Sequence, residues 1–187
     1  GLTIIENDKE ISCSVKCSDS MHDLGKMDYI FITLKAYSIP GLVKEISSMF
    51  KDNTTVITAY NGIPWWYFFN TPGPHKNYRI KCVDPDNIQW NIIKPQRVIG
   101  CVVYPATEVI KPGVIKHIEG NRFSLGEPEG IQTERILSIS RALIKSGIKA
   151  PIRNNLREEV WTKLIGNLAF NPLSVITGKT LDALVAD

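Results

Sequence analysis

Residues 158–172 read EEVWTKLIGNLAFNP and carry the pattern of an amphipathic helix. The apolar residues recur at helical spacing and predict a stripe that faces a core: Val160, Trp161, Leu164, Ile165 and Leu168. Along one edge of that stripe stand Lys163, Asn167 and Asn171, four residues apart. A step of four residues turns about 40° around a helix and rises roughly 6 Å. We therefore expect one ammonium group and two amides to line up beside a core-facing surface.

These polar side chains have two interpretations. Asn171 falls at the azimuth of Val160 and Leu164, where an apolar residue is expected. An unpaired buried amide costs about 1–3 kcal/mol, so a buried Asn171 needs a partner, and a ligand would serve. The alternative is that all three polar residues are solvated side chains on the flank of the helix. Spacing alone leaves both open.

Upstream of this helix, short apolar runs alternate with helical patterns. The predicted strands are residues 28–34, 54–59 and 97–104, and the predicted helices are residues 38–50 and 132–145. A strand–helix–strand order predicts parallel strands joined by a right-handed crossover. The chain is therefore expected to have an α/β fold.

Turn residues between apolar runs predict two hairpins. Residues 2–5 and 11–15 flank Asn7-Asp8, and residues 114–118 and 122–125 flank Gly120-Asn121. Asn155 is expected to cap the long helix, with Glu158 three residues later completing a capping box. A domain junction is therefore expected near Arg153 and Asn154.

The composition is that of an ordinary globular protein, with 43% hydrophobic and 22% charged residues. A net charge of +3 without a long basic run gives no argument for nucleic-acid binding. No run of about 18 apolar residues predicts a membrane span, and no signal peptide is evident, so a cytoplasmic protein is expected. The four cysteines and three histidines lack ligand spacing, so we expect no metal site and mostly buried, reduced thiols.

Several stretches of the sequence resemble the ketopantoate reductase (2-dehydropantoate 2-reductase) family. The run E-x-x-W-x-K-L-x-x-N-x-x-x-N-P resembles the signature that opens the helical substrate domain of that family. FITLKA at residues 31–36 and TAYNGI at residues 58–63 resemble its strands that end in Lys-Ala and Asn-Gly. Residues 98–103 and 111–117 resemble later strands. The resemblance covers nearly the whole chain.

The resemblance implies a partial Rossmann-like NADP-binding domain over residues 1–153, followed by the first helices of an all-helical substrate domain over residues 154–187. No G-x-G-x-x-G occurs in the sequence, although such glycines let the backbone approach the pyrophosphate of a dinucleotide. In the family, that loop precedes the region that matches the start of this chain. We therefore expect an internal fragment that binds NADPH poorly and self-associates through an exposed sheet edge.

The resemblance further implies an enzyme that uses NADPH to reduce a 2-oxo acid, of the 2-dehydropantoate to pantoate type. Lys163 matches the catalytic lysine of the family, and Asn167 and Asn171 match its substrate-binding asparagines. Lys35 and Asn61, each just past a predicted strand, match residues beside the nicotinamide and ribose. A lysine near an apolar helix face suits general-acid chemistry, because desolvation lowers its pKa.

Two other functions stay open. Residues 64–69, PWWYFF, are more aromatic than the same stretch of many relatives. They form either a helix packed on the sheet or an aromatic wall of the acyl pocket, and the wall would favour a different branched 2-oxo acid. The other function is a non-catalytic Rossmann-like binding or oligomerisation module. A longer gene that carries G-x-G-x-x-G would favour a reductase over that module.

Overall fold

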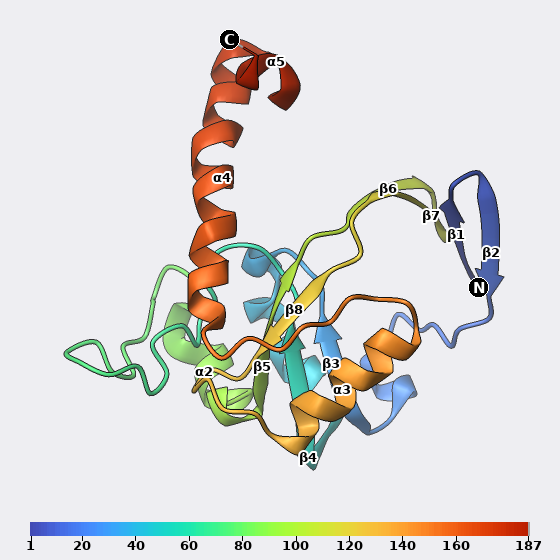
Figure 1. The fold of residues 1–187 in the computed structure, drawn as a ribbon. Coiled ribbons are helices and arrows are strands. Elements are labelled where there is room, and N and C mark those ends of the chain that lie inside the picture. The colour runs from blue at the N-terminus through green and yellow to red at the C-terminus, as the bar shows by residue number, and fades with distance from the viewer. Residues whose placement is uncertain (187) are drawn as a thin grey trace.

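The computed structural model describes residues 1–186 and has an α/β architecture (Figure 1). Its main sheet has the strand order β3-β4-β5-β8, with β3 Met27–Ile32, β4 Phe50–Thr58, β5 Val98–Val103 and β8 Phe123–Gly126. Strands β3, β4 and β5 run parallel, and β8 runs antiparallel to β5. The predicted α/β class and the parallel pairing of the first two buried strands are confirmed.

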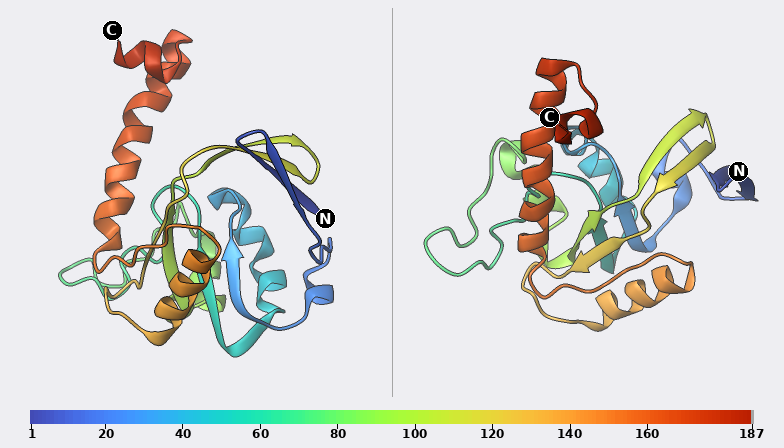
Figure 2. Two further views of the ribbon diagram at one scale, coloured as in Figure 1. Left: turned by 45° about the vertical axis from the view of Figure 1, so that its right-hand side comes forward. Right: turned by 45° about the horizontal axis from the view of Figure 1, so that its top comes forward.

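Helices cover both faces of the main sheet, as Figures 1 and 2 show. The helices around the sheet are α1 Val43–Ser47, α2 Ile88–Ile92 and α3 Glu134–Lys145. Successive strand residues point to opposite faces, so Val56 joins the core that contains α1, and Ile57 joins the core that contains α3. The helix predicted over residues 38–50 is too long. Two 3-10 turns precede α1, and Phe50 already begins β4.

A second sheet stands beside the main one and has the strand order β2-β1-β7-β6. Its strands are β1 Leu2–Glu6, β2 Lys9–Cys13, β6 Ala106–Lys111 and β7 Val114–Glu119. The predicted β1–β2 hairpin is confirmed, and Asn7 and Asp8 turn it with positive φ angles. The hairpin predicted around Gly120-Asn121 is wrong, because β7 pairs with β6 and β1 whereas β8 pairs with β5. A turn residue marks where the chain bends but does not choose the strand's partner.

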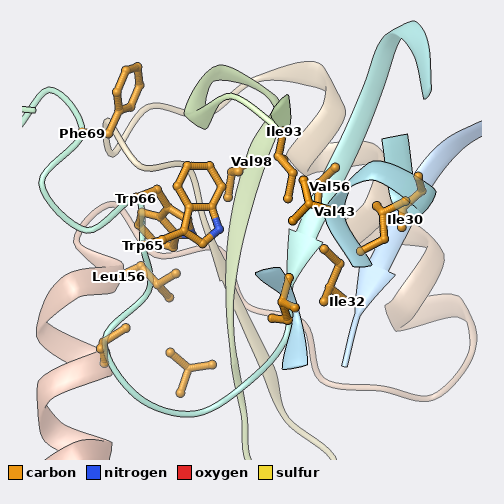
Figure 3. Packing of buried hydrophobic residues seen from close by; sticks show 14 of the residues in the cluster. Ile30, Ile32, Val43, Val56, Trp65, Trp66, Phe69, Ile93, Val98 and Leu156 are labelled. Atoms are coloured by element: carbon orange, nitrogen blue, oxygen red, sulfur yellow. The ribbon is translucent and has the colours of Figure 1, made fainter. Parts of the chain in front are cut away.

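The aromatic run at residues 64–69 forms turns and not the helix we considered. Trp65, Trp66 and Phe69 are nevertheless buried in the core on the α1 side of the sheet (Figure 3). The Trp66 Nε1 donates a hydrogen bond to Thr58 Oγ1 at 3.0 Å. The packing interpretation of these rings is therefore confirmed, although the secondary structure differs.

The long helix, α4 Leu156–Thr177, packs on the sheet only at its beginning and then extends away from it towards α5 Leu181–Val185 (Figures 1 and 2). Leu156 and Val160 are buried. Further along, the expected core-facing stripe is largely exposed, at 44% for Trp161, 62% for Ile165 and 59% for Leu168. That expectation is wrong because the helix runs beyond the edge of the sheet.

Two smaller expectations also fail. Asn155 precedes α4 as predicted, but its side chain makes no capping hydrogen bond, so the capping box is absent. Of the four cysteines only Cys101 is buried, so the prediction of mostly buried thiols is wrong. Within residues 1–186, no helix is long and apolar enough to cross a membrane.

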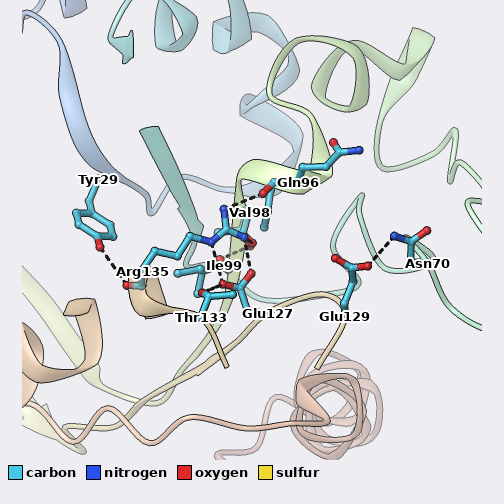
Figure 4. A network of polar contacts seen from close by, with 10 residues as sticks. Tyr29, Asn70, Gln96, Val98, Ile99, Glu127, Glu129, Thr133 and Arg135 are labelled. Atoms are coloured by element: carbon cyan, nitrogen blue, oxygen red, sulfur yellow. Dashed lines mark hydrogen bonds and ion pairs between the residues drawn. The ribbon is translucent and has the colours of Figure 1, made fainter. Parts of the chain in front are cut away.

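A buried ion pair joins the end of β8 to the start of α3 (Figure 4). Glu127, 4% exposed, accepts hydrogen bonds from Thr133 Oγ1 at 2.5 Å and from Arg135 Nε at 2.8 Å. The same guanidinium donates to the carbonyl oxygens of Gln96 and Val98 at 2.7 and 3.2 Å. This network holds the start of α3 against the end of the sheet at which β5 begins and β8 ends (Figure 4).

Candidate active site

A narrow cleft lies where strands β4 and β5 end beside the first half of α4. The residues that line it are Tyr60, Asn61, Gly62, Val102, Val160, Lys163, Leu164 and Asn167. Asn61 and Gly62 come just after β4, and the last four residues of that list come from α4. The cavity measures about 10 Å³, which is room for about one water molecule. Three of the five predicted site residues, Asn61, Lys163 and Asn167, therefore share one cleft.

Lys163 is a half-buried lysine in this cleft, and the pKa of its ammonium group is shifted. Its Nζ donates a hydrogen bond to the Val103 carbonyl oxygen and lies 5.0 Å from the centre of the Tyr104 ring. Burial lowers the pKa of Lys163 below its ordinary value, and the nearby Cys101 thiol partly offsets that effect. A lysine of lowered pKa beside two amides can donate a proton to a carbonyl oxygen and stabilise the charge that develops there.

The other two predicted residues lie apart from the cleft. Asn171, one turn beyond Asn167, is exposed and does not line the cleft. The expectation that Asn171 lies beside a core-facing surface with Lys163 and Asn167 is wrong, because α4 has left the sheet by then. Lys35 follows β3 and is exposed, at the residue that precedes a 3-10 turn. It lies at the same end of the sheet, since β3 and β4 are parallel.

A second small cavity lies behind the cleft and shares Tyr60, Gly62 and Val160 with it. Burial, and then the charge of Asp84, raise the pKa of Tyr60. Burial also raises the pKa of the Cys101 thiol to about 12, so this thiol stays neutral and is a poor nucleophile. Among Tyr60, Cys101 and Lys163, only Lys163 has a pKa that is shifted towards neutral pH.

Sequence reasoning missed the residues that surround Lys163. Val102 and Tyr104 are at the end of β5, and Glu159 precedes Lys163 by one helical turn. The sequence could have pointed to Glu159, because it precedes Lys163 by four residues and such residues lie on the same face of a helix. No sequence pattern points to Tyr104, because only the tertiary structure brings its ring to the ammonium.

Comparisons with known proteins show what this chain is similar to. Residues 1–65 match the family model described as ketopantoate reductase PanE/ApbA. Over all 187 residues the chain is 47% identical to the 2-dehydropantoate 2-reductase of Mesorhizobium japonicum and covers 57% of that protein. The structure matches a candidate ketopantoate reductase from Ralstonia solanacearum MolK2 with a TM-score of 0.94 and 33% identity, over all of this chain and 58% of that one.

A further solved structure supports the fold alone. It is the 2-dehydropantoate 2-reductase from Geobacter metallireducens GS-15, with a TM-score of 0.80 and 21% identity, over all of this chain and 56% of that one. The chain thus spans a little more than half the length of each of these three relatives.

Proposed function

We propose that this chain supplies part of the active site of an NADPH-dependent 2-oxo acid reductase. Its resemblance to the ketopantoate reductases, which the comparisons confirm, supports this proposal. The reaction is of the 2-dehydropantoate to pantoate type. One observation carries the proposal: the half-buried amine of Lys163 lines the same cleft as Asn61 and Asn167, where two parallel strands end. Ligands in open α/β sheets bind outside that end of the strands.

Lys163 is the proton donor in this proposal. Its ammonium would hydrogen-bond the keto oxygen of the substrate and pass a proton to it as the oxygen gains negative charge. Asn167 lies one turn further along α4 and lines the same cleft, so its amide is placed to bind a hydroxyl or carboxylate of the substrate. Asn171 would bind a more distant part of the substrate, since it is exposed beyond the cleft.

The residues after β3 and β4 fit the nicotinamide end of the cofactor, which supplies a hydride when bound. Asn61 offers an exposed amide that can hydrogen-bond a nicotinamide carboxamide or a ribose hydroxyl. Gly62 has a φ of 96°, and a Cβ built on it would meet no atom within 4 Å, so the space above it is open. Lys35 is an exposed cation at the neighbouring strand end. These features support cofactor binding at Lys35 and Asn61.

Under this proposal residues 1–153 form a nucleotide-binding part of the chain. Residues 154–187 form the beginning of a substrate domain. The Arg153 N–H donates to the Leu125 carbonyl oxygen at 2.7 Å, which is the last backbone bond to the sheet before α4 begins. Beyond this point α4 leaves the sheet with an exposed apolar surface. That surface and the free edge of β3 support self-association of the chain.

A different branched substrate receives little support. Trp65 is buried outside the cleft, and Trp66 lines only the small cavity behind it. The aromatic run therefore acts mainly as core packing, and we keep 2-dehydropantoate as the proposed substrate class.

The test replaces Lys163 by Ala in the longer protein that contains this chain, and Lys145 by Ala as a control. Lys145 is an exposed lysine at the end of α3. With 2-dehydropantoate as substrate, Lys163→Ala should lower kcat by about 10²–10⁴-fold, the usual range for general acid–base catalysis, while calorimetry shows unchanged NADPH affinity. Lys145→Ala should leave both unchanged. A normal kcat for Lys163→Ala would remove this lysine from the mechanism.

The 187-residue chain itself should bind NADPH weakly and not turn over, because it contains no G-x-G-x-x-G to hold the pyrophosphate. Calorimetric titration of the purified chain with NADPH measures this directly. Micromolar affinity together with reduction of a 2-oxo acid would contradict the expectation.

A further inference from the structure

Glu159 is a nearly buried carboxylate one turn before Lys163 on α4, with 14% of its side chain exposed. It accepts a hydrogen bond from Ser124 Oγ at 2.6 Å. It also pairs with Arg153 Nε at 2.9 Å and Arg122 Nη2 at 3.7 Å. Glu159 thus ties the start of α4 to β8 and to the loop that precedes α4.

Tyr104 connects this carboxylate to the catalytic lysine. The Arg122 guanidinium carbon lies 3.9 Å from the centre of the Tyr104 ring, and Lys163 Nζ lies over the same ring at 5.0 Å. The Tyr104 hydroxyl also interacts with the Glu159 carboxylate. One aromatic ring therefore lies against two cations, and one of them, Arg122, is paired with Glu159.

The charge of Glu159 is maintained by its neighbours. Burial alone would raise the pKa of Glu159, but the hydrogen bonds from Ser124 and Tyr104 and the two arginines outweigh it and lower the pKa. The carboxylate therefore stays ionised and balances Arg122. The hydrogen bonds and ion pairs of residues 1–186 include none between Glu159 and Lys163. The contacts that link Glu159 to the amine run through Arg122 and the Tyr104 ring.

We propose that Glu159 is a positioning residue for Lys163: by holding Tyr104 and Arg122, it fixes the ring on which the Lys163 ammonium rests. The ring then keeps the amine directed at the cleft that contains Asn61 and Asn167. The importance of this arrangement for catalysis rests on the function proposed above. The position of the amine, in contrast, can be measured without turnover.

The experiment reads the position of Lys163 from the ring current of Tyr104. Protons above an aromatic face shift upfield, so in protein labelled with ¹³C-lysine the Hε signals of Lys163 should lie upfield of the other lysines. Lys163→Arg assigns these signals, and Tyr104→Leu shows their position when the ring is absent. Glu159→Gln should lose most of the upfield shift. Glu158→Gln removes the adjacent exposed carboxylate and should keep it.

A folded Glu159→Gln protein that keeps the full upfield shift would overturn the proposal. If this variant does not fold, Tyr104→Phe decides the question, because it keeps the ring and removes only the hydroxyl that meets Glu159. Loss of most of the shift in Tyr104→Phe supports the proposal, and a full shift overturns it. Failure of the proposed function would appear elsewhere, as an unchanged kcat in Lys163→Ala.

Kinetics of the active protein give a second measurement, which separates a positioning role of Glu159 from a merely structural one. Glu159→Gln should lower kcat and leave the KM for NADPH unchanged, because the amine loses its direction while the cofactor site is intact. Glu159→Asp keeps the charge and should recover part of the loss. An equal loss in Glu159→Asp and Glu159→Gln would contradict a role of the carboxylate charge.

Discussion

Gly100 and Gly126 lie directly opposite one another on β5 and β8. At both positions Leu156 occupies space that a side chain would need. A Cβ on Gly100 would lie 2.6 Å from Leu156 Cδ2, and a Cβ on Gly126 would lie 2.6 Å from Leu156 Cβ. The two glycines therefore let the first residue of α4 reach the backbone of the sheet. This contact sets the position of the helix that carries Lys163.

Gly126→Ala should destabilise the protein by about 1–3 kcal/mol, the usual cost of overpacking a core. The new methyl group would also meet the Arg153 carbonyl oxygen at 2.9 Å, and a backbone atom cannot move aside as a flexible side chain can. Urea unfolding of the variant and the parent measures the difference.

Gly166→Ala is the matched control for that substitution. Gly166 is in α4, and a Cβ built there meets no atom within 4 Å. Alanine should therefore stabilise the helix by about 0.5–1 kcal/mol, because glycine loses more backbone entropy on folding. Equal effects of the two substitutions would show that backbone entropy, and not the contact with Leu156, dominates at Gly126.

Glu127→Gln should destabilise the protein by about 1.5–3 kcal/mol, since hydrogen bonds to charged groups contribute about that much. The substitution replaces Oε2, which accepts from Arg135 Nη2, by an NH2 group that cannot accept a hydrogen bond, and it removes the negative charge of the ion pair (Figure 4). The urea midpoint should fall while the slope of the transition stays the same.

The control for this prediction is Glu129→Gln. Glu129 is exposed and accepts one hydrogen bond, from Asn70 Nδ2 at 2.8 Å. Its substitution should change stability by less than about 0.5 kcal/mol, as surface substitutions usually do. A loss as large as that of Glu127→Gln would mean that burial of the carboxylate is not the cause.

Lys163 should make the stability of the protein depend on alkaline pH. Burial lowers its pKa from 10.5, so between the lowered pKa and 10.5 the folded state binds fewer protons than the unfolded state. The free energy of unfolding therefore gains a contribution that grows as pH rises through this window, and below the window the full cost of burying the charge is present. Relative to Lys163→Met, the parent should gain stability as pH rises towards 10.5.

Denaturant unfolding of both proteins from about pH 7 upward measures that gain. Lys44→Met, at an exposed position of α1, controls for the loss of a positive charge. A difference between parent and Lys163→Met that stays constant with pH would show that the amine is as well solvated in the folded chain as in the unfolded one.

Arg157 should restrain the long loop that follows the aromatic run (Figure 1). Its guanidinium donates to the carbonyl oxygens of Tyr67 and Phe69 at 2.6 and 2.9 Å. Lysine lacks this fork of donors, and losing a hydrogen bond of about 1 kcal/mol raises local opening roughly fivefold. Arg157→Lys should therefore speed proteolytic cleavage within residues 70–78 by about that factor.

Limited proteolysis with mass spectrometry of the fragments gives the cleavage rate and site. Arg141→Lys is the control, because Arg141 is an exposed residue of α3 whose pair with Glu134 spans 3.6 Å. Faster cleavage in both variants, or cleavage of Arg157→Lys outside the loop, would argue against a local restraint.

The sequence by itself determined the parallel strands and the start of the long helix. Apolar runs of strand length and the helical spacing around Lys163 are local patterns. They survive in the structure because the strands are buried and the start of α4 packs on the sheet through Leu156 and Val160. The same spacing brought Lys163 and Asn167 to one side of α4, and the strand-end position of Asn61 brought it to the same cleft.

Only the tertiary structure decided which strands pair and which apolar residues are covered. β7 and β8 follow one another in sequence but join different sheets, because pairing depends on which edges are free and not on the turn between the strands. Trp161 and Ile165 repeat like core residues, yet they are exposed, because burial needs a facing surface that periodicity does not specify. Arg122 and Lys163 meet at the Tyr104 ring, and Arg122 pairs with Glu159, for the same reason: these contacts join segments that are distant in sequence.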